Sequence, residues 1–174
     1  ISNSIEHDYP ERNFSTVLFK KKSNPFAVPA GFEDALIQSH SNTIFHIHGG
    51  FIPVFYSISK LMRKLNRKFI FTPHGSYNRI AWRKSGFSKR IYFNLFENNM
   101  LKNASLVHVL GKSETEGLIT ISSGLEIVRA PYGFELASNE ILPTRAPKEN
   151  YLIGFCGRID IYTKGLDVLV KAFA

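Results

Sequence analysis

The sequence predicts an α/β fold in which a Rossmann-like parallel sheet carries helices on both faces. Short apolar stretches rich in aromatic and β-branched residues alternate along the chain with stretches whose apolar residues recur at helical spacing. Strands that alternate with helices in this way form parallel sheets, because each helix returns the chain to the start of the next strand. A hydrophobic fraction of 44% over 174 residues suffices for the core of such a domain.

The expected elements follow one another from residue 14. Strands are expected at 14–20, 43–48, 69–72, 106–110, 126–130 and 151–156. Helices are expected at 31–39 and 54–65, after Ser88, after Ser113 and from Leu166. Ser88 and Ser113 are the expected N-caps of their helices, and Glu116 completes a capping box with Ser113. Two prolines and many polar residues predict a linker at 136–150.

Two of the predicted strands end in histidines and glycines, in the sequences FHIHGGF at 45–51 and TPHGS at 72–76. Ligands of parallel α/β sheets bind beyond the carboxyl ends of the strands. His46 and His48 alternate with apolar residues and therefore share one face of their strand. The glycines that follow, Gly49 and Gly50, leave room for a ligand or another backbone.

His74 stands in a turn between a proline and Gly75. A neutral imidazole fixed there could accept a proton, or bind a hydroxyl or phosphate group, near pH 7. The structural alternative, for this histidine as for His46 and His48, is a side chain that only hydrogen-bonds a loop.

A third strand end, CGRIDIYTKG at 156–165, carries two cations six residues apart. Arg158 and Lys164 precede a predicted helix, whose free backbone N–H groups and dipole favour an anion. We therefore expect a phosphate-sized anion site here, with a surface pair of cations as the alternative. Cys156 lies in the predicted apolar strand, which indicates a buried, unreactive thiol and a reducing compartment.

The net charge of +8 is concentrated in two clusters, which lie at 60–68 and 79–90. Nucleic acid, an anionic membrane surface or a phosphorylated substrate would each suit such clusters, and a solvated helix face is the structural alternative. The sequence has no run of about 18 apolar residues and no visible signal peptide, so we expect a cytoplasmic location.

Two other classes of function fit part of the sequence. His46 and His48, with His74 as a third ligand, would suit a metal-dependent hydrolase, although no convincing Asp, Glu or Cys follows at another strand end. The basic clusters, with Tyr77, Trp82 and Phe87 among them, would suit a nucleic-acid-binding module. A nicotinamide-dependent dehydrogenase is disfavoured, because no GxGxxG sequence follows a predicted strand.

The combination of FHIHGG, FTPHG, APYGFE and GFCGRIDIYTKGLDVLVKAF resembles the family-four (group 1) glycosyltransferases over roughly residues 43–174. The resemblance implies a retaining enzyme of GT-B architecture, with two Rossmann-like domains facing a cleft. It implies an N-terminal acceptor-side domain at 1–135 and, from 151, the first strand and helix of the nucleotide-sugar-binding domain.

The resemblance also implies roles for individual residues. Arg158 and Lys164 match the pair that holds the diphosphate of a nucleotide-sugar donor, without a metal cofactor. His74 matches the histidine on the acceptor side, and His48, Gly49, Gly50 and Gly75 match residues that line the cleft.

The implied partners are a nucleotide-sugar donor, a saccharide or lipid-diphosphate acceptor and the cytoplasmic membrane face, with no nucleic acid. The implied process is the synthesis of cell-surface polysaccharide. The acidic donor-binding motif of the family and its opening glycine-rich loop are not found in the sequence. We therefore expect this chain alone not to catalyse transfer.

Overall fold

The computed structural model describes residues 14–83, 86–133, 153–157, 159 and 161–173. The chain divides into two compact units, 1–131 and 132–174, and each is described by itself. The expected linker at 136–150 lies outside the described residues. The elements of the first unit are α1 (Phe32–Gln38), β1 (Phe45–His48), α2 (Pro53–Lys64), β2 (Phe69–Thr72), α3 (Arg79–Arg83), α4 (Phe87–Tyr92), the π-helix η1 (Phe93–Glu97), α5 (Asn98–Asn103), β3 (Leu106–Val109), α6 (Lys112–Ile121) and β4 (Ile127–Arg129).

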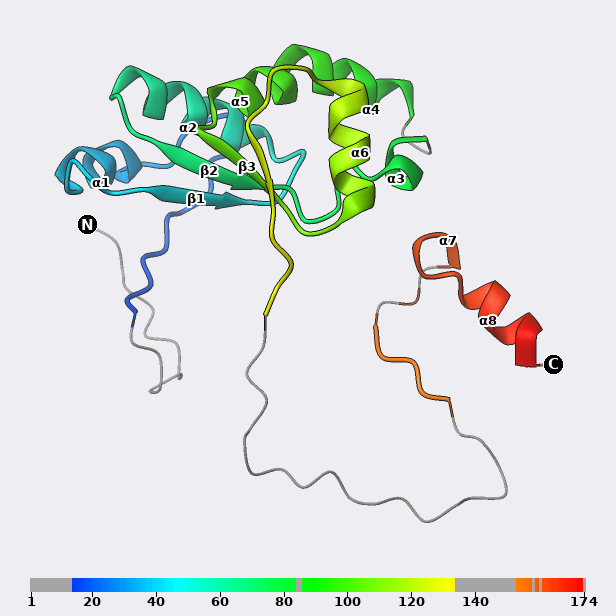
Figure 1. Ribbon diagram of the computed structural model, residues 1–174. Coiled ribbons are helices and arrows are strands. Elements are labelled where there is room, and N and C mark those ends of the chain that lie inside the picture. Colours follow the sequence, from blue (N-terminus) through cyan, green and yellow to red (C-terminus); the bar gives the residue numbers. More distant parts are fainter. Residues whose placement is uncertain (1–13, 84–85, 134–152, 158, 160, 174) are drawn as a thin grey trace. The chain divides into compact units, whose positions relative to one another are not determined.

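The four strands of the first unit form one parallel sheet in the order β1-β2-β3-β4, as Figure 1 shows for the first three. The expected parallel α/β sheet is thus confirmed. Each connection steps the same way across the sheet, and right-handed crossovers then place all connecting helices on one face. Figure 1 shows α2, α4, α5 and α6 on the same side of the sheet. Within the described residues, this one-sided cover differs from the expected helices on both faces.

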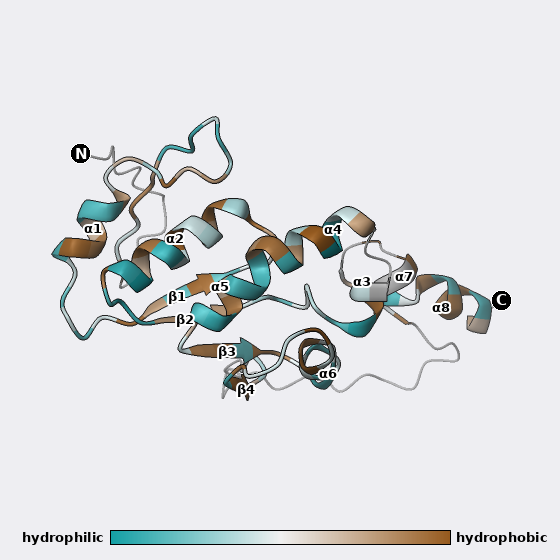
Figure 2. Cartoon of the chain, turned by 90° about the horizontal axis from the view of Figure 1, so that it is seen from above, coloured by the Kyte–Doolittle hydropathy of each residue, from teal (hydrophilic) through white to brown (hydrophobic). Residues whose placement is uncertain are grey.

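The core lies between the sheet and these helices. Ile47, Phe71 and Val107 project from three neighbouring strands toward the helices and are almost fully buried. Seen from above in Figure 2, α2 and α5 lie across β1 and β2, and α6 lies beside β4. Burying three such side chains contributes several kcal/mol, at roughly 2 kcal/mol for each. The apolar alternation of the strands therefore fixes which face of the sheet holds the core.

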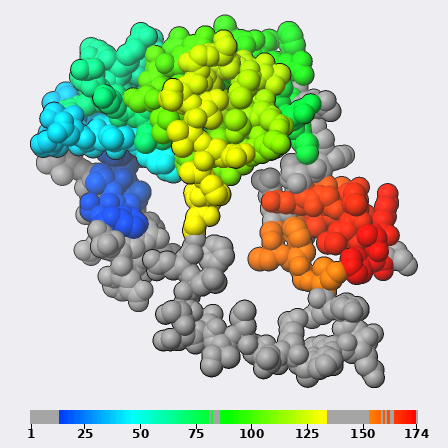
Figure 3. Space-filling model, viewed as in Figure 1, coloured from blue at the N-terminus to red at the C-terminus, as the bar shows by residue number. Residues whose placement is uncertain are grey.

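The opposite face of the sheet carries the alternate residues of each strand. His46 and His48 of β1 are exposed there, and so are Ile44 just before the strand and Val128 of β4. In Figure 3 the yellow atoms of α6, β4 and the residues around them form the near surface of the first unit, at the edge of the sheet. The histidines therefore lie on the face that the connecting helices leave open.

Several predicted boundaries are wrong. Residues 14–20 form no strand, because they pair with no neighbour in the sheet. α4 begins at Phe87 after the N-cap Gly86, one residue before the expected cap Ser88. The N-cap of α6 is Gly111, so Ser113 already lies inside the helix. Instead of the expected capping box, Glu116 lies 3.9 Å from Lys112 in an exposed ion pair.

The second unit contains α7 (Ile161–Lys164) and α8 (Leu166–Phe173), which meet at Gly165. Gly165 has φ +63°, a left-handed conformation that suits glycine at the end of a helix. The expected helix from Leu166 is confirmed. Residues 153–156, the described part of the expected strand, are not in a strand, and Cys156 is exposed. The expectation of a buried thiol is wrong, because no neighbouring strand covers this segment within the described part of the chain.

None of the described helices is both long enough and apolar enough to cross a membrane.

Candidate functional site

The loops that follow β1 and β2 lie against each other at the carboxyl edge of the sheet. A methyl group at Gly50 would lie 2.9 Å from the Cβ of Ser76, so only glycine allows this contact. In the first loop Gly49 has φ +100° and Phe51 has φ +61°, and in the second loop His74 has φ +53°. A non-glycine residue in the left-handed region costs about 1–3 kcal/mol, and such strain often accompanies function.

These loops bring His48 and His74 together. The Nδ1 atom of His48 lies 2.9 Å from the Nε2 atom of His74, at hydrogen-bond distance. His48 is the last residue of β1, and His74 is the second residue after β2, so both stand where ligands of parallel sheets bind. Gly75, with φ +81°, follows His74 in the same turn. The structure thus joins two of the histidines that the sequence singled out.

His46 takes part in a different chain of hydrogen bonds. Its Nε2 atom lies 2.6 Å from the hydroxyl of Thr72, which lies 2.9 Å from Nδ1 of His108. The Nε2–H group of His108 donates to the carbonyl oxygen of Ala130 at 2.7 Å. A neutral His108 must then accept the Thr72 hydroxyl proton at Nδ1, and Thr72 accepts the Nε2–H group of His46. His46 and His108 therefore hold strands together, which is the structural alternative for His46.

Sequence reasoning missed Thr72 and His108. Each is the residue on the open face nearest the carboxyl end of its strand, and in the sequence His108 alternates with Val107 and Val109 as His46 and His48 do with their apolar neighbours. That alternation was the available signal.

His46 and His48 lie close together and are partly buried, which disfavours their charged forms. Partial burial, and then the neighbouring histidines, lower the pKa of His46 and of His48 below the usual value of 6.5. The rings of His46 and His48 are 4.0 Å apart between centroids, close enough for two positive charges to repel strongly. Both imidazoles are therefore neutral at pH 7 and able to accept a proton or a hydrogen bond.

Glu114 of α6 lies beneath the turn that carries His74. It is 3% exposed, and burial raises the pKa of its carboxyl. The backbone amides of Gly75, Leu110 and Tyr77 approach it and lower that pKa in part, but none meets either oxygen with the geometry of a good hydrogen bond. The carboxyl group of Glu114, whose burial cost these amides offset only in part, therefore lies against the turn on its core side.

The expected anion site belongs to the second unit. Lys164 is the last residue of α7 and is exposed, and Arg158 lies outside the described residues. The structure does not place Lys164 relative to His74, because they belong to different units. The donor-binding role of this pair stays a prediction.

The first basic cluster has a partly structural role. Arg67 donates hydrogen bonds to the carbonyl oxygens of Ile37, Ser39 and His40, at the end of α1. Its guanidinium therefore ties the end of α1 to the turn between α2 and β2. Tyr77, one of the aromatics expected to stack on nucleic-acid bases, is fully buried, so it cannot form such a platform.

Among the described residues, no group of three or more His, Cys, Asp or Glu side chains could hold a metal ion. His46 and His48 each use a ring nitrogen in a hydrogen bond, to Thr72 and to His74 respectively.

Comparison with protein families, with curated proteins and with solved structures finds no match to this chain.

Proposed function

We propose that this chain belongs to a retaining glycosyltransferase, which moves a sugar from a nucleotide-sugar donor to a saccharide or lipid-linked acceptor in the synthesis of cell-surface polysaccharide. The observation that carries the proposal is the His48–His74 pair at the carboxyl edge of a parallel sheet. An acceptor hydroxyl must be oriented and must lose its proton during transfer, and a neutral imidazole can bind it or take that proton.

The loops around the pair suit such a role. Gly50 lets the two loops lie against each other, because a Cβ there would lie 2.9 Å from the Cβ of Ser76, and the positive φ angles of Gly49 and Gly75 suit glycine in the turns beside the histidines. In this proposal Arg158 and Lys164 bind the donor diphosphate and stabilise the charge that develops as the nucleoside diphosphate leaves. No divalent metal is required for that step, because the two cations supply the positive charge. The histidine-bearing sheet is the acceptor side.

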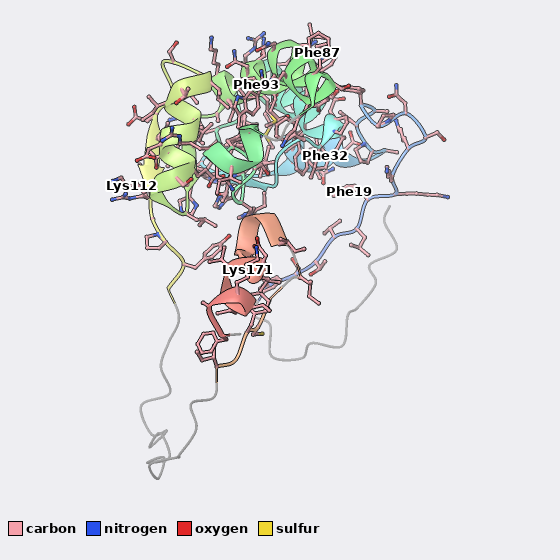
Figure 4. The ribbon with its side chains drawn as sticks, turned by 90° about the vertical axis from the view of Figure 1, so that its right-hand side faces the viewer. Phe19, Phe32, Phe87, Phe93, Lys112 and Lys171 are labelled. Atoms are coloured by element: carbon pink, nitrogen blue, oxygen red, sulfur yellow. The ribbon has the colours of Figure 1, made fainter. Side chains whose placement is uncertain are left out.

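An anionic membrane surface is the partner that we propose beside the acceptor. On α4 and η1, Phe87, Ile91 and Leu95 recur every four residues and are 79%, 42% and 59% exposed. Figure 4 shows Phe87 at the outer surface of this region. Arg90 is exposed on the same helix, and clustered cations attract anionic headgroups at about 1 kcal/mol each. A lipid-linked acceptor would reach the site from such a surface.

The test is an acceptor-dependent release of nucleoside diphosphate. The complete product of the reading frame that contains this chain is incubated with UDP-, GDP- and dTDP-sugars and with lipid-diphosphate saccharides, in the presence of a chelator. We expect one donor to give release that needs an acceptor and is lost in Lys164→Ala. The proposal fails if no donor is consumed and added Zn²⁺ instead gives a hydrolytic activity. That activity should then be abolished in both His46→Ala and His48→Ala.

A further inference from the structure

The buried carboxylate of Glu97 joins the two loops that carry the paired histidines. Its Oε1 atom accepts a hydrogen bond from the backbone N–H of Phe51 at 2.7 Å and another from the hydroxyl of Tyr77 at 2.5 Å. Phe51 is the third residue after His48, and Tyr77 is the third residue after His74. One oxygen atom therefore fixes both loops at matching positions.

Glu97 has no exposed surface, so its position is set by the core. It ends η1, the π-helical turn between α4 and α5, and such turns are rare and often occur at functional sites. In Figure 4 Phe93, at the start of the same turn, lies among the packed side chains. A buried carboxylate in an apolar helical segment is costly unless hydrogen bonds compensate it. The two loop contacts compensate the Oε1 atom, whereas the buried Oε2 atom has no hydrogen-bond partner among the described residues.

Burial dominates the electrostatics of Glu97, and its hydrogen bonds offset that effect only in part. Burial raises the pKa of its carboxyl, whereas the Phe51 amide, the Tyr77 hydroxyl and the ammonium group of Lys89 lower it. Lys89 lies over the ring of Phe51, with Nζ 4.2 Å from the ring centroid. Its ammonium group thus stands beside the residue that Glu97 holds in the left-handed conformation. These contacts bind the first loop more tightly than one hydrogen bond would.

We propose that Glu97 is a positioning residue, which sets the distance between His48 and His74 by clamping their loops. Two observations carry this inference: the shared Oε1 acceptor, and the strained backbone that the clamp holds at Phe51. The inference deepens the proposed function and rests on it for its catalytic meaning. The geometry itself can be tested without any sugar transfer.

The experiment records the ring nitrogen and proton signals of the histidines in the purified 174-residue chain over a range of pH. Four variants are compared with the wild type: Glu97→Ala, Glu97→Gln, Tyr77→Phe and Ser122→Ala. The last is the matched control, because Ser122 is 7% exposed and loses one hydrogen bond, to Asn98 next to Glu97, but no bond to either loop. His40, at the end of α1 outside the histidine group, serves as the internal reference.

We expect Glu97→Ala to raise the titration midpoint of His48 toward 6.5, the value of an unperturbed histidine, because burial and the His74 ring now lower it. Tyr77→Phe should move it part of the way, since one of the two clamp bonds remains. Glu97→Gln should restore the wild-type midpoint, because its amide oxygen can accept both hydrogen bonds. The His40 reference should stay unchanged throughout.

Unchanged His48 and His74 signals in Glu97→Ala, or equal shifts in Ser122→Ala, would overturn the inference. If Glu97→Ala does not fold, Tyr77→Phe decides: a shift confined to His48 and His74 supports the clamp, and no shift refutes it. A protein that fails to transfer sugar but shows these shifts would keep the clamp and lose the proposed function.

Discussion

Replacing Gly117 with alanine should destabilise the first unit, because α6 leaves no room for a methyl group at this position. The new Cβ would lie 1.9 Å from the carbonyl oxygen of Tyr77 and 3.0 Å from its carbonyl carbon. Cβ atoms essentially never approach other heavy atoms closer than 3.0 Å, so the helix and the turn would have to separate by about 1 Å. The atom in the way belongs to the backbone of the turn that carries His74 and cannot swing aside.

The size of the effect follows from two opposing contributions. Forcing a group into a packed region costs about 1–3 kcal/mol, and contact with backbone puts this case near 3 kcal/mol. Alanine favours a helix interior over glycine by about 1 kcal/mol, which offsets part of that cost. We therefore expect Gly117→Ala to lower the free energy of unfolding by about 2 kcal/mol.

The assay is urea unfolding followed by the fluorescence of Trp82, the only tryptophan, which packs edge-on against the buried ring of Phe93. The matched control is Gly86→Ala, because a Cβ at Gly86 meets nothing within 4 Å. The control should lower the unfolding free energy by about 1 kcal/mol or less, because alanine is a poorer N-cap than glycine. Equal stability of the two variants would refute the close packing of α6 on the turn.

Three further predictions concern the histidines, the thiol and the surface. The lowered pKa values of His46 and His48 mean that the unfolded chain binds protons more readily, so stability should fall as the pH drops below about 6.5. Calorimetry should show this fall to be smaller in a variant with glutamine at both positions, and an unchanged fall would contradict the assignment. Cys156 should react with a thiol reagent without denaturant, because it is exposed; a reaction that requires urea would contradict that exposure. The chain should sediment with anionic but not with neutral vesicles, and Phe87→Ser should weaken this more than Phe14→Ser, a change at another exposed phenylalanine. Equal sedimentation with both kinds of vesicle would count against the proposed partner.

A short apolar run predicted a strand correctly where that run pairs with neighbouring strands in the sheet. The expected range 69–72 is the observed β2, and β1 and β3 differ from expectation only at their ends. Alternation also placed His46 and His48 on one face, because side chains of a strand point to opposite sides in turn. Residues 14–20 carry similar apolar character but form no strand, because pairing is decided by distant partners and not by local composition.

The sequence indicated which histidines belong to the site, but not the hydrogen bonds that they make. A single sequence names His48 and His74 but does not give the 2.9 Å contact between them, which depends on how two loops pack. Glu97 left one signal: it lies four residues after Phe93 and three before Met100, on the apolar side of a helical segment. A charged residue at such a position indicates a buried carboxylate with specific partners, although the partners come from distant parts of the chain.

Caps were the least predictable feature. Serines at 88 and 113 match the residue preference of an N-cap, yet glycines at 86 and 111 hold those positions. The preference for serine over glycine at a cap is only a few tenths of a kcal/mol, so tertiary packing easily decides where a helix begins.

The most direct measurement of the central claim compares His74→Ala with His108→Ala in acceptor-dependent sugar transfer. His108 lies in β3 and is hydrogen-bonded to Thr72 and Ala130. His74 lies in the turn after β2 and pairs with His48. Loss of a general base or of an acceptor contact typically costs about 100-fold or more in rate. The proposal predicts such a loss for His74→Ala and a change of less than about tenfold for His108→Ala. Wild-type transfer by the His74 variant would contradict it.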